Sequence, residues 1–251
     1  MNLIILTDSD KLDDTRYLLQ DYRAEHIRTV LKLEAGGSFE IGLLNGPRGR
    51  AVIEKISAKD ITVRVENLEN IPPPELTVDL ICALPRPQTL KKVLFTSAMM
   101  GVRSLHLIRA NRVEKSYFQS PLLEPENYVP HLIEGLSQGK LTRLPEVVVH
   151  DRFKVFFEDT LPGLERNSDI KLVKLAADPE AKGDLGEIMD KKASWLLFAI
   201  GPEGGWVPFE IETMEKTGFR RFTLGRWLLR VEHAVTATLS QLELLYRESG
   251  G

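Results

Sequence analysis

The pattern of apolar and polar residues changes its period near residue 70. In the part before it, several segments alternate apolar with polar side chains, and turn signals such as Asn-Gly-Pro and Ala-Lys-Asp separate them. This alternation predicts strands with one buried face, and a helix is predicted between them at residues 24–33. We therefore expect a small β-rich domain over residues 1–70. Its strand candidates are residues 3–6, 39–44, 50–56 and 61–66.

A proline-rich stretch at residues 66–75 separates the two parts of the chain. It contains the consecutive prolines Pro72, Pro73 and Pro74. Proline can neither continue a helix nor donate a hydrogen bond to a central strand. We therefore predict a linker here and a second domain over residues 71–251.

The second part alternates nearly continuous apolar segments with helical ones. Apolar strands that alternate with helices are typical of a parallel sheet with both faces covered. A final helix is predicted at residues 231–246, because its apolar residues recur on one face. The strand candidates are residues 76–84, 104–108, 146–150, 170–176 and 195–201, and the earlier helix candidates are residues 88–100, 126–138, 151–159 and 184–191.

Composition narrows the class of protein. The chain has 251 residues, of which 43% are hydrophobic, so it can bury a sizeable core. It shows neither a leader pattern nor an apolar run of roughly 20 residues, and we expect a cytoplasmic protein. Its single cysteine, Cys82, lies in an apolar strand and predicts a buried thiol rather than a disulfide. The five histidines show no ligand spacing, so no metal is expected.

The charge is unevenly distributed although the net charge is only −3. Residues 86–115 carry seven basic residues against the single acid Glu114, and residues 216–230 carry five basic residues and no acid. Two solvated faces would explain this pattern. If both segments lie on one surface, they would instead form a footprint for a phosphate backbone.

A glycine-rich turn follows the predicted strand at residues 195–201, where the sequence reads FAIGPEGGW over residues 198–206. Ligands of open α/β sheets bind outside the carboxyl ends of the strands. Glycine allows close approach of the backbone and positive φ. No Gly-Lys-Ser/Thr follows, so the turn is not a P-loop, and it does not match the dinucleotide fingerprint either. An ordinary strand-to-helix turn without a ligand stays open at this point.

A second glycine loop, RRFTLGRWLLRVEHA at residues 220–234, repeats the same arrangement. IGPEGG followed by LGxxxLRxExA resembles the ribosomal RNA small subunit methyltransferase E family. The segments AEHIRTVLKL, RVEKSYFQS and SQGKLTRLPEV are similar to the N-terminal helix and middle section of that family. The resemblance thus covers nearly the whole chain.

The resemblance implies a fold and an activity. It implies a PUA-like RNA-binding β-barrel domain over residues 1–70 and a SPOUT α/β methyltransferase domain with a trefoil knot over residues 71–251. The expected enzyme is a homodimer that uses S-adenosyl-L-methionine to methylate N-3 of a uridine in small-subunit (16S) ribosomal RNA. Its partners would be that RNA or the assembled small ribosomal subunit, in rRNA processing and ribosome biogenesis.

The resemblance also assigns cofactor-binding residues, whose backbone groups and aliphatic side chains suit an adenosine moiety. Glu203 could contact the ligand or only accept backbone hydrogen bonds that hold its loop. The expected cofactor residues are Leu175, Ala176, Ile200, Gly201, Pro202, Glu203, Gly204, Gly205, Leu224, Gly225, Leu228 and Leu229.

Arg230 and Glu232 are the candidate catalytic residues. Arg230 could stabilise negative charge that develops on the uracil oxygens. Glu232 could accept the N-3 proton if burial raises its pKa, or it could orient Arg230. His233 is an alternative base. Candidate RNA contacts come from the first helix and from the basic segment after the linker: Arg23, His26, Arg28, Lys32, Arg86, Lys91 and Lys92.

Two departures from the family pattern bear on function. Trp227 stands where the family usually has arginine, and His233 replaces a threonine. They leave open an RNA-binding scaffold without methyl transfer. A SPOUT enzyme that methylates the ribose 2′-oxygen is a further alternative.

Overall fold

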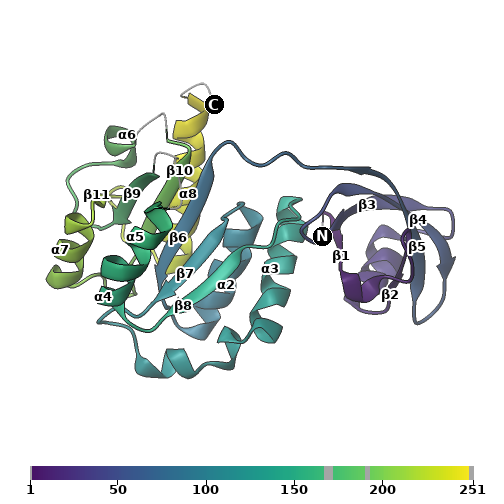
Figure 1. The fold of residues 1–251 in the computed structure, drawn as a ribbon. Coiled ribbons are helices and arrows are strands. Elements are labelled where there is room, and N and C mark those ends of the chain that lie inside the picture. Colours follow the sequence, from purple (N-terminus) through teal and green to yellow (C-terminus); the bar gives the residue numbers. More distant parts are fainter. Residues whose placement is uncertain (1, 167–171, 190–192, 249–251) are drawn as a thin grey trace. The chain divides into compact units, whose positions relative to one another are not determined.

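The computed structural model describes residues 2–166, 172–189 and 193–248 (Figure 1). The chain divides into two compact units. The first contains Met1–Pro73 together with the returning segment Ile133–Leu144, and the second contains Pro74–Leu132 and Pro145–Gly251. The boundary near residue 70 agrees with the proline-rich linker. The returning segment was not expected. It begins inside the helix predicted at residues 126–138, and nothing in the local pattern marks a domain boundary there.

The first unit is built on a mixed five-stranded sheet in the order β1-β3-β4-β5-β2. β1 pairs parallel to β3, and the other pairs are antiparallel. β2 was missed in the sequence, and β5 extends into the predicted linker. The strands are β1 (Ile4–Leu6), β2 (Arg16–Leu19), β3 (Ser38–Leu43), β4 (Arg48–Ile56) and β5 (Ile61–Glu69).

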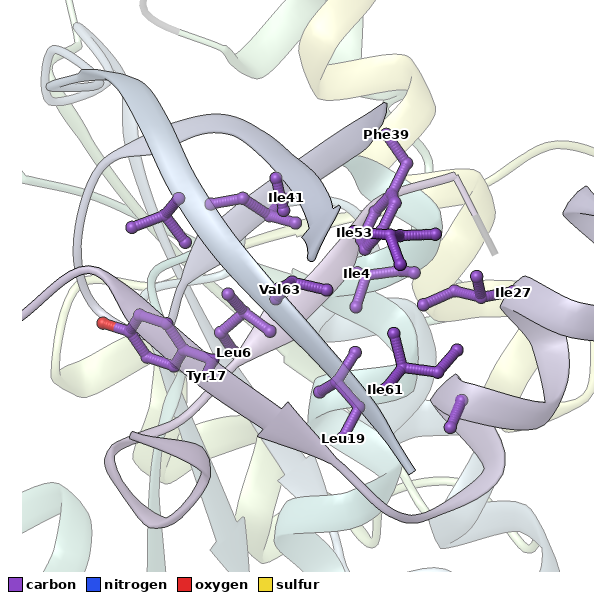
Figure 2. Packing of buried hydrophobic residues seen from close by; sticks show 13 residues of the cluster. Ile4, Leu6, Tyr17, Leu19, Ile27, Phe39, Ile41, Ile53, Ile61 and Val63 are labelled. Atoms are coloured by element: carbon purple, nitrogen blue, oxygen red, sulfur yellow. The ribbon is translucent and has the colours of Figure 1, made fainter. Parts of the chain in front are cut away.

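Inward-facing aliphatic residues of these strands form the core of the first unit (Figure 2). Ile41, Ile53 and Val63 come from three adjacent strands and are fully or almost fully buried. Ala24 and Ile27 of the following helical segment add to the same cluster. Alternate positions along each strand therefore face one core, as the sequence pattern predicted for these strands.

The predicted helix at residues 24–33 has two parts. α1 (Tyr22–His26) begins at Asp21, whose side chain accepts a hydrogen bond from the Arg23 backbone N–H at 2.9 Å. A π-helical turn, η2 (Ile27–Leu31), follows, and Lys32 ends it in the left-handed conformation with φ of 51°. The helical segment is thus present, with wider winding in its second half.

The second unit contains the predicted parallel sheet. All five of its strand pairs are parallel, in the order β11-β9-β10-β6-β7-β8. Its strands lack alternation because both faces are covered: every residue of β7 and of β10 is buried. The strands are β6 (Thr77–Ala83), β7 (Ser104–Ile108), β8 (Glu146–His150), β9 (Leu172–Ala177), β10 (Trp195–Ile200) and β11 (Arg220–Phe222).

The longer helices of the second unit match their predictions. α8 (Val231–Glu248) packs against α2 (Pro87–Met99) and β10 (Figure 1). The helix predicted at residues 151–159 is present as the first part of a continuous helical segment over residues 153–166, whose middle is π-helical. Residues 170, 171, 190 and 191 of two other predictions lie outside the described residues. The remaining helices are α3 (Pro125–Gly139), α4 (Phe153–Val155), α5 (Leu161–Arg166), α6 (Leu185–Ile188) and α7 (Pro208–Lys216).

Three short 3-10 helices, η1 (Asp8–Asp10), η3 (Lys115–Gln119) and η4 (Pro121–Leu123), lie in the connecting segments, and the π-helical η5 (Phe156–Thr160) joins α4 to α5. Within the described ranges, no helix combines the length and the apolar character that crossing a bilayer requires.

Candidate functional site

Three neighbouring strands of the second unit end at the same edge of the sheet. Ala176 of β9 is in register with Ala199 of β10 and with Arg221 of β11, so the loops that follow these strands start side by side. Together with the start of α8 they line a cleft of about 1120 Å³, which we call the strand-end cleft. Its position is that of ligand sites in other open α/β sheets.

Most of the expected cofactor residues line the strand-end cleft: Ile200, Gly201, Pro202, Glu203, Gly204, Gly205, Leu224, Leu228 and Leu229. Leu175 and Ala176 do not, because both are fully buried within β9. The lining at that strand end comes from the next residues along the chain, Ala177 and Asp178. Gly225 is not a lining residue either, although its neighbour Leu224 is.

Gly201 lies against the indole of Trp206, a residue of the same loop. A Cβ at Gly201 would lie 3.1 Å from Cε2 of Trp206, closer than ordinary van der Waals contact. The indole is buried, and its Nε1 donates a hydrogen bond to the Ala177 carbonyl at 3.1 Å. Trp206 therefore fastens the turn after β10 to the end of β9, and a side chain at residue 201 would require the indole or the turn to shift.

Gly204 and Gly205 have two other reasons to be glycine. A Cβ at Gly204 would lie 3.0 Å from Cδ of Arg112, whose Nη1 donates a hydrogen bond to the Gly204 carbonyl. Gly205 has a φ of +74°, and its N–H bonds to the Pro202 carbonyl at 2.8 Å. The glycines of this turn thus accommodate the protein's own side chains and a tight turn, and the turn's backbone faces the cleft.

The second glycine loop exposes apolar side chains. Trp227 is 71% exposed, Leu228 83% and Leu229 42%. The Arg226 guanidinium lies 4.8 Å from the centroid of the Trp227 ring. Gly225 has a φ of +119°, which side chains rarely adopt, and this bends the loop around the rim of the cleft.

A smaller cavity of about 390 Å³, which we call the side pocket, adjoins the strand-end cleft. Four residues line both cavities: Arg112, Glu203, Arg230 and Val231. The side pocket is otherwise lined by Arg86, Thr89, Glu114, Tyr117 and Glu232. The candidate catalytic residues Arg230 and Glu232 therefore lie in one pocket, next to the cleft.

Glu232 is buried and ion-paired rather than poised as a base. Its Oε1 lies 3.1 Å from Nζ of Lys92, which comes from α2. Burial would raise the pKa of Glu232, but hydrogen bonds from its own backbone N–H and from Lys92 outweigh burial and hold the pKa below its ordinary value. The condition under which Glu232 could serve as a base, a pKa raised by burial, is therefore not met, and Glu232 is a carboxylate that fixes the start of α8 to Lys92.

Arg230 and His233 differ in their positions. Both are exposed, but only Arg230 lines the two cavities. His233 lies on the next turn, outside both sets of lining residues. The geometry therefore favours Arg230 and gives no support to His233 as a base.

Arg23 is withdrawn from the candidate RNA contacts. It is only 8% exposed, and its guanidinium bonds to the Asp10 carboxylate at 2.6 Å, to Asp21 and to the Ile5 carbonyl. This arginine organises the interior of the first unit. Nothing in the sequence around Arg23 indicates that its side chain is buried.

The other three candidates of the first unit remain on its surface. Lys32 is exposed, whereas Arg28 is held partly by the Ser57 carbonyl at 3.1 Å. His26 is half-buried, and its Nε2 has no hydrogen-bond partner among the described residues. Burial lowers the pKa of His26. These residues leave Lys32 as the most accessible cation of the helical segment.

The basic candidates of the second unit lie at and beside the side pocket. Arg86 lines it and donates from Nε to Thr89 Oγ1 at 3.2 Å. Lys92 does not line it but forms an ion pair with Glu232, which does. Lys91 is exposed on α2 and lines neither cavity. Two of the three cations thus belong to the same site as Arg230.

Sequence reasoning missed the role of Arg112 in this site. It was counted only within a basic segment, yet it lines both cavities and holds the glycine turn. Tyr117, which lines the side pocket, was missed as well. Both belong to the segment RVEKSYFQS, whose resemblance to the family was the one available signal.

Two further expectations concern Cys82 and metals. Cys82 is fully buried, and burial raises the pKa of its thiol. In the part of the chain that the structure describes, no group of three or more His, Cys, Asp or Glu side chains is placed to hold a metal ion.

Comparisons with known proteins identify the family of this chain. A family model described as an RNA methyltransferase domain matches residues 72–243. The chain is 31% identical over 238 residues to the ribosomal RNA small subunit methyltransferase E of Treponema pallidum, covering 94% of this chain and 88% of that protein. It is 25% identical over 240 residues to ribosomal RNA small subunit methyltransferase E 1 of Borreliella burgdorferi, covering 94% and 95%.

Solved structures show the same fold. The ribosomal RNA small subunit methyltransferase E from Neisseria gonorrhoeae, bound to S-adenosyl methionine, matches with a TM-score of 0.76 at 17% identity, covering 97% of this chain and 98% of that chain. A probable rRNA-methyltransferase from Porphyromonas gingivalis matches with a TM-score of 0.74 at 22% identity, covering 98% and 99%. The expected fold class, a SPOUT-type parallel-sheet domain preceded by a small barrel-like domain, is confirmed. Because the family model covers most of the chain and the treponemal relative aligns over nearly its whole length, the chain belongs to the ribosomal RNA small subunit methyltransferase E family.

Proposed function

We propose that the protein is an S-adenosyl-L-methionine-dependent methyltransferase that acts on small-subunit ribosomal RNA and transfers the methyl group to N-3 of a uridine. The observation that carries this proposal is the pairing of two cavities. The strand-end cleft and the side pocket share Arg112, Glu203, Arg230 and Val231, so ligands in the two cavities would be neighbours. A methyl donor and a methyl acceptor require such an arrangement.

The strand-end cleft fits the proposed cofactor. Its volume of about 1120 Å³ is ample for an adenosine with an amino-acid tail. Backbone groups of the two glycine loops can bind the adenine edge, and Ile200, Leu224 and Leu228 supply aliphatic contacts to its faces.

The cofactor supplies an activated methyl group on a positively charged sulfur, which leaves alignment and proton removal to the protein. Arg230 borders both cavities, and its guanidinium can stabilise negative charge on the uracil oxygens. Glu232 keeps the start of α8 in place through Lys92 and thereby positions Arg230, which precedes it by two residues.

The RNA strand would lie along the cations next to the side pocket. Arg86, Lys91 and Lys92 are exposed at the N-terminal half of α2, and Lys32 is exposed on the first unit. Such residues bind phosphates without reading sequence. We therefore expect methyl transfer to weaken steeply as salt is raised.

Two properties of the assembled enzyme belong to the same proposal. As the family resemblance implies, the second unit would be a trefoil knot, and the protein would act as a homodimer with α8 in or near the interface. Sedimentation at micromolar concentration tests the dimer. A monomer that is fully active would contradict it.

The proposal is tested by calorimetry with S-adenosyl-L-methionine, followed by methyl transfer to unmodified small ribosomal subunits and mass mapping of the product nucleoside. We expect binding of the cofactor and one N-3-methylated uridine. Binding without transfer to any RNA would indicate a scaffold. A methyl group on a ribose 2′-oxygen would assign the other SPOUT activity.

A further inference from the structure

The carboxylates around the side pocket differ in whether they already have a partner within the chain. Glu232 is paired with Lys92, and Glu114 interacts with the hydroxyl of Tyr117. Glu203 has no hydrogen bond or ion pair with any residue that the structure describes, although it is exposed and lines both cavities. Glu203 is therefore the carboxylate that is free to bind a ligand at the boundary.

Two guanidinium groups line the same boundary. Arg112 is held beside Glu203 by its hydrogen bond to the carbonyl of the next residue, Gly204. Arg230 enters from the start of α8 and lines both cavities as well. The boundary thus presents one hydrogen-bond acceptor together with two donors.

This set of groups is complementary to one edge of uracil. The edge presents the acceptor O2, the donor N3–H and the acceptor O4 in sequence. Guanidinium donors match the two oxygens, and a carboxylate matches the N3–H. Cytosine presents a lone pair at N3 and an amino group at C4, so it would oppose a carboxylate to a lone pair and a guanidinium to an amino group.

We infer that Arg112, Glu203 and Arg230 bind the uracil edge of the methyl-accepting nucleotide, and that Glu203 accepts the N3 proton. This inference rests on the proposed function and assigns residues to its substrate. The N3–H bond breaks, the proton moves to a carboxylate oxygen of Glu203, and the electron pair stays on N3 and spreads to O2 and O4. The two arginines stabilise this anion.

The remaining steps balance the charge. N3 then takes the methyl group from the cofactor, whose S–C bond breaks with its electron pair remaining on sulfur. Glu203 is exposed and returns its proton to solvent. The side pocket, at about 390 Å³, has room for one flipped nucleotide, and Tyr117 supplies an aromatic ring in its lining.

Other charged and titratable groups lie around Glu203. They include the guanidiniums and carboxylates of the side pocket. They also include the Tyr117 hydroxyl and the buried Cys82 thiol, and the negative charge of Glu203 contributes to the raised pKa of both groups. The groups of the pocket wall are Arg86, Arg112, Glu114, Arg230 and Glu232. A test must therefore separate proton acceptance from a change in local charge.

The variant Glu203→Gln removes the base and keeps the shape, and it breaks no contact of the folded chain. We expect cofactor affinity within about three-fold of wild type and single-turnover methyl transfer to unmodified small subunits slower by about 10²–10⁴-fold at pH 7. The deficit should shrink as pH rises, since hydroxide can take the proton. It should also shrink on subunits reconstituted with 5-fluorouridine RNA, whose N3–H is more acidic.

Glu158→Gln, an exposed glutamate of η5 outside both cavities, is the matched control and should behave as wild type. If Glu203→Gln transfers at the wild-type rate, or if its deficit is the same at every pH and on both RNAs, the inference is wrong while the proposed function stands. A loss of cofactor affinity that equals the loss of rate would also overturn it. A wild-type protein that leaves N3 unmethylated overturns both proposals.

Discussion

The turn after β10 offers a direct way to test what its glycines do, through the variant Gly201→Ala. The added Cβ would lie 3.1 Å from Cε2 and 3.2 Å from Nε1 of Trp206. The indole has little freedom to yield, because it is buried, bonds to the Ala177 carbonyl and packs edge-on against Phe153 at a centroid distance of 6.1 Å. Either the ring or the turn must therefore shift by a few tenths of an ångström.

The expected magnitude follows from two opposing effects. Overpacking of this kind lowers the free energy of unfolding by about 1–3 kcal/mol. Replacing glycine by alanine reduces the entropy of the unfolded chain and returns about 0.4–1 kcal/mol, since Gly201 does not have a positive φ. We expect a net loss of about 1–2 kcal/mol. Because the same turn lines the strand-end cleft, cofactor affinity should fall by about ten-fold, or about 1.4 kcal/mol.

Gly204→Ala is the matched control in the same turn. Its Cβ would meet Cδ of Arg112 at 3.0 Å, but that side chain is flexible and belongs to an exposed residue, so it can move by a few tenths of an ångström and keep its bond to the Gly204 carbonyl. Unfolding by urea should thus leave Gly204→Ala within about 0.5 kcal/mol of wild type, and calorimetry gives the affinities of both variants. The reasoning is refuted if Gly201→Ala matches wild type in both measurements, or if Gly204→Ala is equally destabilised.

Three further predictions concern other parts of the chain. Arg230→Ala should keep cofactor affinity within a few-fold and slow single-turnover transfer by about 10²-fold, with partial recovery in Arg230→Lys; lost stability with normal turnover per folded molecule would contradict this. Asp10→Asn removes one of the two carboxylates that pair with the buried Arg23 guanidinium, while Asp21 remains, and should lower the urea-derived free energy of unfolding by about 1–3 kcal/mol; wild-type stability would show that the pair contributes little. Burial, with His150 nearby, lowers the pKa of His106 from 6.5 to about 4, so the unfolded chain binds the proton first. Stability should therefore fall as pH decreases through that window, with a smaller slope in His106→Gln, and an unchanged slope would refute the assignment.

The local pattern of apolar and polar residues was sufficient to predict most strands and the type of sheet in each unit. The alternating segments before the proline-rich linker became the strands of the mixed sheet, and the continuous apolar segments after it became the parallel sheet. The residues after β10 and β11 could be assigned to one site, because parallel strands place their carboxyl ends at the same edge. These inferences succeeded because side-chain periodicity and glycine turns depend on neighbours in the sequence.

Helix length was only partly determined in this way. Residues 24–33 and 151–159 have helical patterns, yet both contain π-helical turns, at η2 and η5. In each case large side chains of the turn, such as Ile27 and Phe156, are fully buried against other elements. The π-helical turns thus carry buried side chains whose contacts with other elements no local pattern records.

The chemistry of individual side chains was decided by contacts between distant segments. Arg23 became an interior residue because Asp10 lies opposite it, Glu232 stayed ionised because Lys92 reaches it from α2, and Arg112 entered the site by bonding to a turn far away in the sequence. A charged side chain is free for a ligand only when the fold gives it no partner of its own. The sequence by itself therefore determined where the site lies, whereas the tertiary structure decided which charges remain available in it, because burial and pairing are properties of residues brought together across the fold.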